Sequence, residues 1–251
     1  MNRKQKLNEI RNKLASKEPS IGSWMQIPSS SIAEIMGQSG YDWVAVDMEH
    51  GSIGHHQLPD LFRALELGDT LPLARIAEGT PKDCKQALDA GAGGVIVPMI
   101  KSAEQLISIR DSCRWPPAGN RGVAFSRANL FGNNFESYIE EAQSPLLVAM
   151  IEDIKAVDTL DEILDVHGLD AILIGPYDLS ASMGKTSMFD DVNFCKVIDL
   201  IVNKAKSAAV PVGIHLVKPS SVELNKYLSS GYTFIAYSID AVFLSLSAKF
   251  K

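Results

Sequence analysis

Eight short apolar segments recur along the sequence, and segments with the periodicity of an α-helix alternate with them. We predict the apolar segments to be strands: SIGSWMQI (20–27), DWVAVDME (42–49), LPLARI (71–76), GVIVPMI (94–100), LLVAMIE (146–152), AILIGP (171–176), VPVGIHL (210–216) and YTFIAYSI (232–239). Strands that alternate with helices are typical of parallel sheets with right-handed crossovers. Eight such units in 251 residues predict a (β/α)8 barrel that spans residues 1–251 as a single domain.

The charge pattern argues against two classes of partner. The net charge is −6, and the sequence contains no tract of Lys and Arg. Nucleic acids and anionic membranes both favour clustered positive charge, so we expect neither as a partner. No run approaches the roughly 18 apolar residues that a membrane span requires. Residues 1–20 are basic but lack the apolar core of a secretory signal, and we predict a polar amphipathic helix there.

The cysteines indicate the compartment. Cys84, Cys113 and Cys195 are an odd number, and no CxxC spacing occurs. This usage favours a reducing, cytoplasmic environment over a disulfide framework.

Ionisable residues follow five of the predicted strands. They are Asp47, Glu49 and His50 after the second strand, Arg75 in the third, Glu152 and Asp153 after the fifth, Asp178 after the sixth and His215 near the end of the seventh. In a (β/α)8 barrel the reactive side chains lie at the carboxyl ends of the strands. These residues therefore define the candidate site.

Alternation along the strands brings an acid and an arginine together. Asp47 and Glu49 share one face of their strand, and Arg75 shares a face with Leu71 and Leu73 of the next strand. Asp47 could therefore hold the Arg75 guanidinium, whose planar fork fits a carboxylate or a developing enolate oxygen. A purely structural salt bridge at the strand ends explains the same spacing equally well.

Glu152 and Asp178 are the candidate metal ligands, because they follow consecutive strands. Two carboxylates leave most of an octahedral shell to water and substrate oxygens, as Mg²⁺ and Mn²⁺ prefer. The alternatives are a helix cap for Asp178 and a cap or surface acid for Glu152. His50 is the candidate general base, because an imidazole titrates near neutral pH.

Two absences narrow the chemistry. No predicted strand carries a lysine in its interior, so a Schiff-base mechanism has no obvious nucleophile. The end of the eighth strand lacks the Gly-rich turn that holds a phosphate in many barrels, which disfavours a phosphorylated substrate.

Residues 115–135 interrupt the alternation with a long irregular segment, which we interpret as an ordered active-site loop.

Six motifs carry a resemblance to a known family. They are GSWMQIPSSSIAEIMGQSGYDWVAVDMEHG, LARI, ALDAGAGGVIVPMI, PPAGNRGV, IED and IGPYDLSASMG, and they occur in order between about residues 20 and 240. Together they resemble the HpcH/HpaI family of metal-dependent pyruvate aldolases, which includes 4-hydroxy-2-oxoheptanedioate aldolase and 2-dehydro-3-deoxyglucarate aldolase.

The resemblance implies a (β/α)8 barrel, a homo-oligomer (a hexamer or trimer of dimers) and a C-terminal helix exchanged between subunits. It implies a class II aldolase that reversibly cleaves a 4-hydroxy-2-oxo acid to pyruvate and an aldehyde through a metal-bound pyruvate enolate. The metal would be Mg²⁺, Mn²⁺ or Co²⁺. The residue roles that it implies are as follows: Glu152 and Asp178 as metal ligands, Arg75 on the pyruvate oxygens, His50 as catalytic histidine, Asp89 as its acidic partner from a neighbouring subunit, and Gly175 and Pro176 along the pyruvate.

The sequence departs from the family pattern in the segment VAFSRANLFGNNF and at Tyr177, which stands in the substrate-lining motif GPYD. Both departures bear on which aldehyde the enzyme would use, and they leave the metal and pyruvate positions unchanged.

Two other functions are alternatives to the aldolase: an acyl-CoA carbon–carbon lyase of the citrate-lyase β-subunit type, and a non-catalytic binding barrel. No adenine-nucleotide groove is evident for the first, and the complete set of acids, His50 and Arg75 argues against the second.

Overall fold

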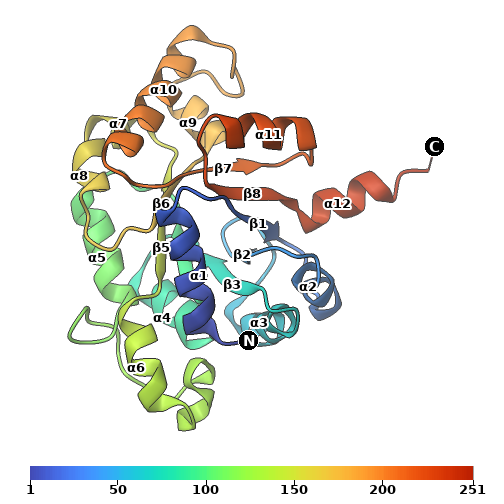
Figure 1. The fold of residues 1–251 in the computed structure, drawn as a ribbon, viewed down its shortest axis with the longest axis vertical. Coiled ribbons are helices and arrows are strands. Elements are labelled where there is room, and N and C mark those ends of the chain that lie inside the picture. The colour runs from blue at the N-terminus through green and yellow to red at the C-terminus, as the bar shows by residue number, and fades with distance from the viewer. Residues whose placement is uncertain (251) are drawn as a thin grey trace.

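The predicted barrel is present. The computed structural model describes residues 1–250, in which eight parallel strands form one closed sheet in sequence order, as Figure 1 shows. The strands are β1 (Ser20–Met25), β2 (Trp43–Asp47), β3 (Leu71–Arg75), β4 (Gly94–Val97), β5 (Leu146–Ile151), β6 (Ala171–Ile174), β7 (Val212–Leu216) and β8 (Phe234–Ile239). Each lies inside a segment predicted from the sequence, so the fold prediction is confirmed.

Helices connect the strands and cover the outside of the barrel. They are α1 (Arg3–Ala15), α2 (Ser30–Gly37), α3 (Leu58–Leu67), α4 (Pro81–Asp89), α5 (Ala103–Cys113), α6 (Phe135–Gln143), α7 (Ile154–Asp158), α8 (Leu160–Leu164), α9 (Pro176–Ser182), α10 (Val192–Ser207), α11 (Ser221–Ser229) and α12 (Asp240–Ser247), with 3₁₀ turns η1 (His55–Gln57) and η2 (Arg127–Gly132). Several begin at a hydroxyl residue whose oxygen accepts a backbone N–H of the first turn, as Ser29, Thr80 and Ser102 do. Within residues 1–250, no helix is long and apolar enough to cross a membrane.

Strand alternation divides the core into two apolar clusters. Val44 and Val46 of β2 face outward and join the cluster between the strands and the helices. Trp43 and Ala45 face inward and join the cluster that fills the barrel. The same alternation directs Asp47, the next inward position, toward the barrel axis at the carboxyl end.

Trp43 fixes the interior packing of the barrel. Its ring stacks on Phe234 of β8, with centroids 4.4 Å apart, and both side chains are fully buried. A Cβ at Gly22 of β1 would lie 2.1 Å from the Trp43 ring, so only glycine leaves space for the indole. The interior is therefore a packed core, and the open volume lies at its carboxyl end.

Helix α1 closes the amino end of the barrel, where the predicted N-terminal helix packs (Figure 1). Its apolar side chains Leu7, Ile10 and Leu14 are buried in the interior cluster. Arg3, at its start, pairs with Glu141 of α6 at 2.7 Å and with Glu66 of α3 at 3.4 Å.

Two connecting segments differ from the expected alternation of one helix with each strand. Between β5 and β6 the chain forms two short helices, α7 and α8, because it leaves helical geometry at Thr159 (φ −112°, ψ 19°). The segment 115–135 follows α5, and helices in this fold end at the amino end of the barrel. Accordingly, Arg127 pairs with Glu66 at the end of α3. The segment is ordered, with Asn129 fully buried. It does not line the pocket of its own chain, so its interpretation as an active-site loop of that pocket is wrong.

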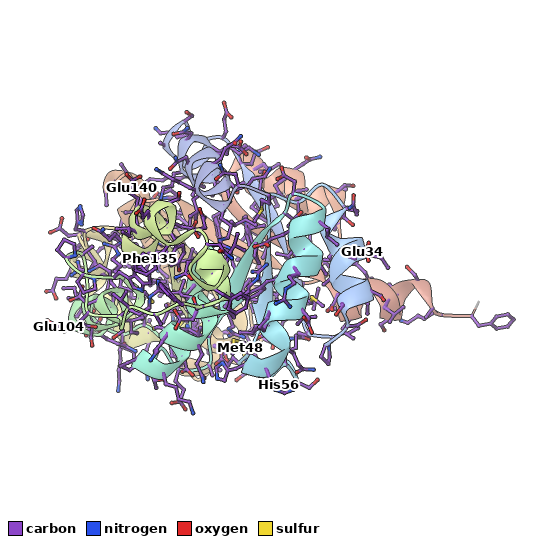
Figure 2. All side chains as sticks on the ribbon, turned by 90° about the horizontal axis from the view of Figure 1, so that it is seen from below. Glu34, Met48, His56, Glu104, Phe135 and Glu140 are labelled. Atoms are coloured by element: carbon purple, nitrogen blue, oxygen red, sulfur yellow. The ribbon has the colours of Figure 1, made fainter. Side chains whose placement is uncertain are left out.

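The C-terminal helix α12 extends away from the barrel, as Figures 1 and 2 show. Its Leu244 and Leu246 are exposed, and Asp240 is its one buried residue. Such a helix leaves apolar surface uncovered.

Candidate active site

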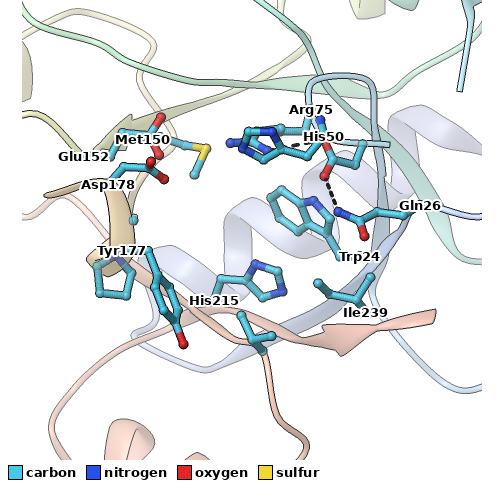
Figure 3. A pocket seen from close by; sticks show the side chains of 14 residues that line it. Trp24, Gln26, His50, Arg75, Met150, Glu152, Tyr177, Asp178, His215 and Ile239 are labelled. Carbon is cyan, nitrogen blue, oxygen red and sulfur yellow. Dashed lines mark hydrogen bonds and ion pairs between the residues drawn. The ribbon is translucent and has the colours of Figure 1, made fainter. Parts of the chain in front are cut away.

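A pocket of about 250 Å³ opens at the carboxyl ends of the strands, and Figure 3 shows its lining. The predicted residues that line it are Asp47, His50, Arg75, Glu152, Gly175, Pro176, Tyr177 and Asp178. The structure thus brings together the residues that were given a role in the site, except Asp89. Two other acids that follow predicted strands, Glu49 and Asp153, are not part of the lining, and Asp153 caps α7. The pocket is also lined by residues that the sequence did not single out for the site, among them Trp24, Gln26 and Met150, and by His215, which had no assigned role.

Asp47 and Arg75 are neighbours across two strands, as predicted. Their Cα atoms are paired in the β2–β3 register, and Arg75 Nη1 lies 3.3 Å from Asp47 Oδ1. Asp47 also accepts hydrogen bonds from Gln26 Nε2 at 2.9 Å and from the backbone N–H groups of Glu49 and His50 at 3.1 Å. Burial alone would raise the pKa of Asp47, but Arg75 and these hydrogen bonds outweigh it and lower the pKa. Asp47 is therefore an ionised anchor for Arg75 and for the backbone that carries His50.

Glu49 is a second partner of the arginine. Its carboxylate forms an ion pair with Arg75 Nη2. Burial raises the pKa of Glu49, against the opposing effect of Arg75. Arg75 is only 4% exposed, and two acids hold its guanidinium. Together these contacts fix the plane of the guanidinium at the pocket wall.

Glu152 has one oxygen satisfied and one free. Its Oε1 accepts the Met99 backbone N–H at 2.7 Å, while Oε2 is buried and has no hydrogen-bond partner within residues 1–250. Burial raises the pKa of Glu152 to about 7, although the Met99 hydrogen bond and Arg75 oppose the rise. A Cβ at Gly175 would lie 2.6 Å from Oε2, so glycine at this position is what lets the backbone approach the carboxylate. This free, buried oxygen is the donor that a cation at the site would use.

Asp178 lies across from Glu152, in the first turn of α9 and not at the strand end itself. Figure 3 shows the two carboxylates side by side at one edge of the pocket. The N-cap of α9 is Gly175, and no side chain caps the helix, so the helix-cap explanation of Asp178 is wrong. Within the described residues no group of three or more His, Cys, Asp or Glu side chains could hold a metal. The site offers a pair of carboxylates.

His50 and Tyr177 stand at the pocket mouth. Both are exposed, and Figure 3 places His50 beside Arg75 and Tyr177 on the opposite side. The Tyr177 ring meets Phe189 edge to face, with centroids 5.0 Å apart. Pro176 begins α9 beside it, where the fixed φ of proline suits a first helical turn.

Asp89 lies outside this pocket, at the end of α4 and therefore at the amino end of the barrel. Its carboxylate is 3.8 Å from Arg121 Nη1, and Oδ1 is buried without a hydrogen-bond partner in the part of the chain that the structure describes. Burial raises the pKa of Asp89, with Arg121 opposing the rise. The role assigned to Asp89 concerns a neighbouring subunit and stays a prediction.

Alternation along the strands also explains two rings in the pocket, His215, which had no assigned role, and Trp24, which the sequence did not single out. His215 is two positions after Gly213 on the inward face of β7, and Trp24 is two positions after Gly22 on β1. Their rings stack with centroids 4.8 Å apart and an interplanar angle of 23°. They form a wall of the pocket, to which the ionisable strand ends contribute His215 but not Trp24.

Known proteins are similar to this chain in sequence and in fold. The family model described as HpcH/HpaI aldolase/citrate lyase matches residues 20–245. A hydroxypyruvate/pyruvate aldolase of Roseobacter denitrificans is 36% identical over 258 residues, covering 98% of each chain. A 2-keto-3-deoxy-L-rhamnonate aldolase of Shigella boydii is 34% identical over 241 residues, covering 95% of this chain and 89% of the relative.

Solved structures agree with the sequence comparison. A HpcH/HpaI aldolase/citrate lyase family protein from Burkholderia cenocepacia superimposes with a TM-score of 0.89 at 29% identity, covering 96% of each chain. The resemblance stated from the motifs and the predicted enzyme class are therefore confirmed. The chain belongs to the HpcH/HpaI aldolase/citrate lyase family and is a carbon–carbon lyase.

Proposed function

We propose that this enzyme is a class II pyruvate aldolase, which reversibly cleaves a 4-hydroxy-2-oxo acid into pyruvate and an aldehyde. One observation carries the proposal: Glu152 and Asp178 face each other in the same pocket as Arg75. The absence of lysine from the pocket lining formed by residues 1–250 supports a mechanism without a Schiff base. The names of the relatives, both of them aldolases, point to the same reaction class.

The two carboxylates fit a divalent cation. Glu152 supplies a buried oxygen without a partner in residues 1–250, and Asp178, exposed on the first turn of α9, lines the same pocket. Hard cations such as Mg²⁺ and Mn²⁺ prefer carboxylate oxygens and keep several positions for water and substrate. Once bound, Mg²⁺, Mn²⁺ or Co²⁺ would act as a Lewis acid on the 2-oxo group.

Arg75 is proposed to bind the carboxylate and keto oxygens of the 2-oxo acid and to stabilise the negative charge that develops on cleavage. Asp47 and Glu49 each pair with one terminal nitrogen of its guanidinium, so the fork has a fixed direction before substrate arrives. Donors that are preorganised toward developing charge lower the barrier more than mobile ones. Gly175, Pro176 and Tyr177 would line the same substrate.

His50 is proposed to accept the proton of the 4-hydroxyl group in the cleavage direction. Its backbone N–H donates to Asp47, so the acid that orients Arg75 also fixes the start of the loop that carries the imidazole. Asp89 of a neighbouring subunit would complete the proton path. This assignment requires an oligomer, in which α12, with its exposed Leu244 and Leu246, packs on another subunit.

We also propose a domain organisation, an oligomeric state and a compartment for the protein. Residues 1–251 act as one domain in a homo-oligomer, a hexamer or trimer of dimers, and the protein works in the cytoplasm. The free state of Cys84, Cys113 and Cys195 supports a reducing compartment.

An acyl-CoA substrate is a poorer fit. Ligand pockets for drug-sized molecules occupy roughly 300–1,000 Å³, whereas this pocket has a volume of about 250 Å³. That volume suits a small oxo acid better than a coenzyme A thioester. The complete set of Asp47, His50, Arg75, Glu152 and Asp178 in one pocket supports catalysis over a purely binding role.

The test is cleavage of a 4-hydroxy-2-oxo acid by protein treated with EDTA, followed by addition of Mg²⁺, Mn²⁺ or Co²⁺. We expect EDTA to abolish turnover and at least one cation to restore it. Asp178→Asn should remove the metal-dependent activity, whereas Asp165→Asn, on an exposed helix end, should not. A lysine adduct trapped by borohydride in the presence of pyruvate would overturn the proposal.

A further inference from the structure

One wall of the pocket is mostly apolar and contains a histidine ring. Trp24, Val217 and Ile239 form this wall together with His215. Figure 3 shows the His215 ring on the side of the pocket away from Glu152 and Asp178, between Tyr177 and Ile239. If the carboxylates and Arg75 hold the 2-oxo acid half of the substrate, this wall faces the other half.

The hydrogen bond at Nε2 determines which nitrogen of His215 carries the proton. Nε2 lies 3.3 Å from the Ser238 carbonyl oxygen, which can only accept. The proton therefore sits on Nε2. Burial lowers the pKa of His215 to about 4, so the ring is neutral and Nδ1 has a free lone pair.

The Ser238 carbonyl is itself held in place. Ser238 has a positive φ of 61°, a conformation that a non-glycine residue rarely adopts without support. Its hydroxyl donates to the Val217 carbonyl at 2.9 Å, and the Ser23 hydroxyl lies 3.4 Å from the Ser238 carbonyl oxygen. This support keeps the tautomer of His215 fixed, while Nδ1 has no hydrogen-bond partner among residues 1–250.

The wall therefore presents an acceptor and no cation. In the described lining of the pocket Arg75 is the one Lys or Arg side chain, and it is already paired with Asp47 and Glu49. A carboxylate on the aldehyde half would meet the lone pair of Nδ1 without a compensating charge. A hydroxyl group would donate to it, and an alkyl group would leave it unpaired.

We propose that His215 is a specificity-determining residue, which accepts at Nδ1 a hydrogen bond from a hydroxyl group on the aldehyde half of the substrate. The enzyme then prefers uncharged hydroxyaldehydes to alkyl or carboxylated aldehydes. This inference rests on the proposed aldolase function.

The experiment compares two aldehydes that differ by one hydroxyl group, 2-hydroxypropanal and propanal, in aldol addition to pyruvate with Mn²⁺ present. His215→Phe keeps a ring to stack on Trp24 and removes the acceptor. His215→Gln offers an acceptor and a donor on a shorter side chain. His56→Phe, at the surface (Figure 2), is the matched control. Deuterium uptake into the pyruvate methyl group from D₂O reports enolate formation without any aldehyde.

We expect wild-type enzyme and His56→Phe to favour 2-hydroxypropanal in kcat/KM by about tenfold, the effect of one hydrogen bond of ordinary strength. His215→Phe should bring the ratio near one by slowing 2-hydroxypropanal much more than propanal, while deuterium uptake remains measurable. His215→Gln should restore part of the preference.

An equal preference in His215→Phe and wild type would overturn the inference while leaving the aldolase proposal intact. So would a wild-type enzyme that does not distinguish the two aldehydes, a result that needs no variant to fold. Absence of both deuterium uptake and addition in wild-type enzyme would instead overturn the aldolase proposal.

Discussion

The two ends of the barrel use charged residues differently. At the amino end, Arg3 pairs with Glu66 and Glu141, and Arg127 pairs with Glu66, so these ion pairs tie α1 to α3 and α6 and tie η2 to α3. At the carboxyl end, Glu152 keeps a buried oxygen without a partner in residues 1–250. An unpaired buried carboxylate costs stability. The contrast indicates that the first set of charges holds the chain together and the second is arranged for a ligand.

Asp89 and Arg121 are the exception at the amino end. They approach no closer than 3.8 Å, and both carry buried polar atoms without hydrogen-bond partners in the described chain. Exposed Phe125 and Phe131 lie on the adjoining segment. Like Glu152 at the carboxyl end, this pair leaves buried polar atoms without partners in the described chain, as expected if it completes a site in a neighbouring subunit.

The largest expected effect follows from Glu152→Gln, which removes a charge from the carboxyl end. Loss of a metal ligand should lower kcat by more than about 10²-fold, because the Lewis acid stabilises the transition state by several kcal/mol. Steady-state cleavage and titration of the metal-free protein with Mn²⁺ measure both consequences. Near-normal turnover would leave Glu152 outside the site.

The same variant should stabilise the metal-free protein at pH 8. The pKa of Glu152 is about 7 in the folded protein, against 4.5 for an unperturbed glutamate, so its contribution to stability is present below about pH 4.5 and lost as the pH rises through 7. The loss is on the order of 3 kcal/mol. Melting curves of both proteins should therefore differ by several degrees at pH 8 and converge at low pH. Lower stability of the variant at pH 8 would contradict the contrast between the two ends, because the Glu152 carboxylate would then stabilise the fold.

Arg75→Lys should have the next largest effect. Lysine keeps the charge but loses the planar fork that Asp47 and Glu49 hold, so we expect kcat to fall on the order of 10²–10³-fold. Metal affinity and the melting temperature should stay close to wild type, because Glu152 and Asp178 are unchanged. Unaltered turnover would make the Asp47–Arg75 pair a structural salt bridge.

Asp89→Asn tests the exception. We expect activity to fall by about 10²-fold, the lower end of the range for a lost proton-transfer group, without a change in fold. Mixing Asp89→Asn subunits with Glu152→Gln subunits should restore activity, since some sites would then combine wild-type residues from two chains. Failure of the mixture to exceed either variant alone, after subunit exchange is verified, argues against a shared site.

The smallest effect on catalysis is expected for Arg127→Met at the amino end. Removing one partner of the ion pair with Glu66 should lower stability by about 2 kcal/mol, because the remaining carboxylate is mostly buried. Turnover should stay within about twofold of wild type at a temperature where both proteins are folded. A large loss of turnover without a loss of stability would assign these charges a part in function.

Much of the carboxyl end could be predicted from the sequence, because strand periodicity is a local property. Alternation directs Asp47 inward, and parallel pairing of consecutive strands brings it beside Arg75. The same reasoning applied to Gly213 would have directed His215 into the pocket. The fixed tautomer of His215 could not be predicted, since it depends on the left-handed backbone of Ser238 in another strand.

Two other features could not be predicted, because they depend on where helices begin and end. Asp178 belongs to the first turn of α9, and the direction of its side chain depends on where that helix begins. The segment 115–135 has the composition of a functional loop. Its place at the amino end follows from its position after a helix instead of a strand.

Closure of the barrel between β1 and β8 has a consequence for how the chain folds. Ser20 pairs with Phe234, and Gly22 with Ala236, so the last edge of the sheet closes only when nearly the whole chain is available. Contacts between residues so far apart in sequence slow folding, because a long loop must be ordered before they form. During synthesis at about 5–20 residues per second, the open edge of β1 has no β8 to pair with for on the order of ten seconds or more. The nascent chain is thus most vulnerable to misassociation late in translation, just before its eighth strand emerges.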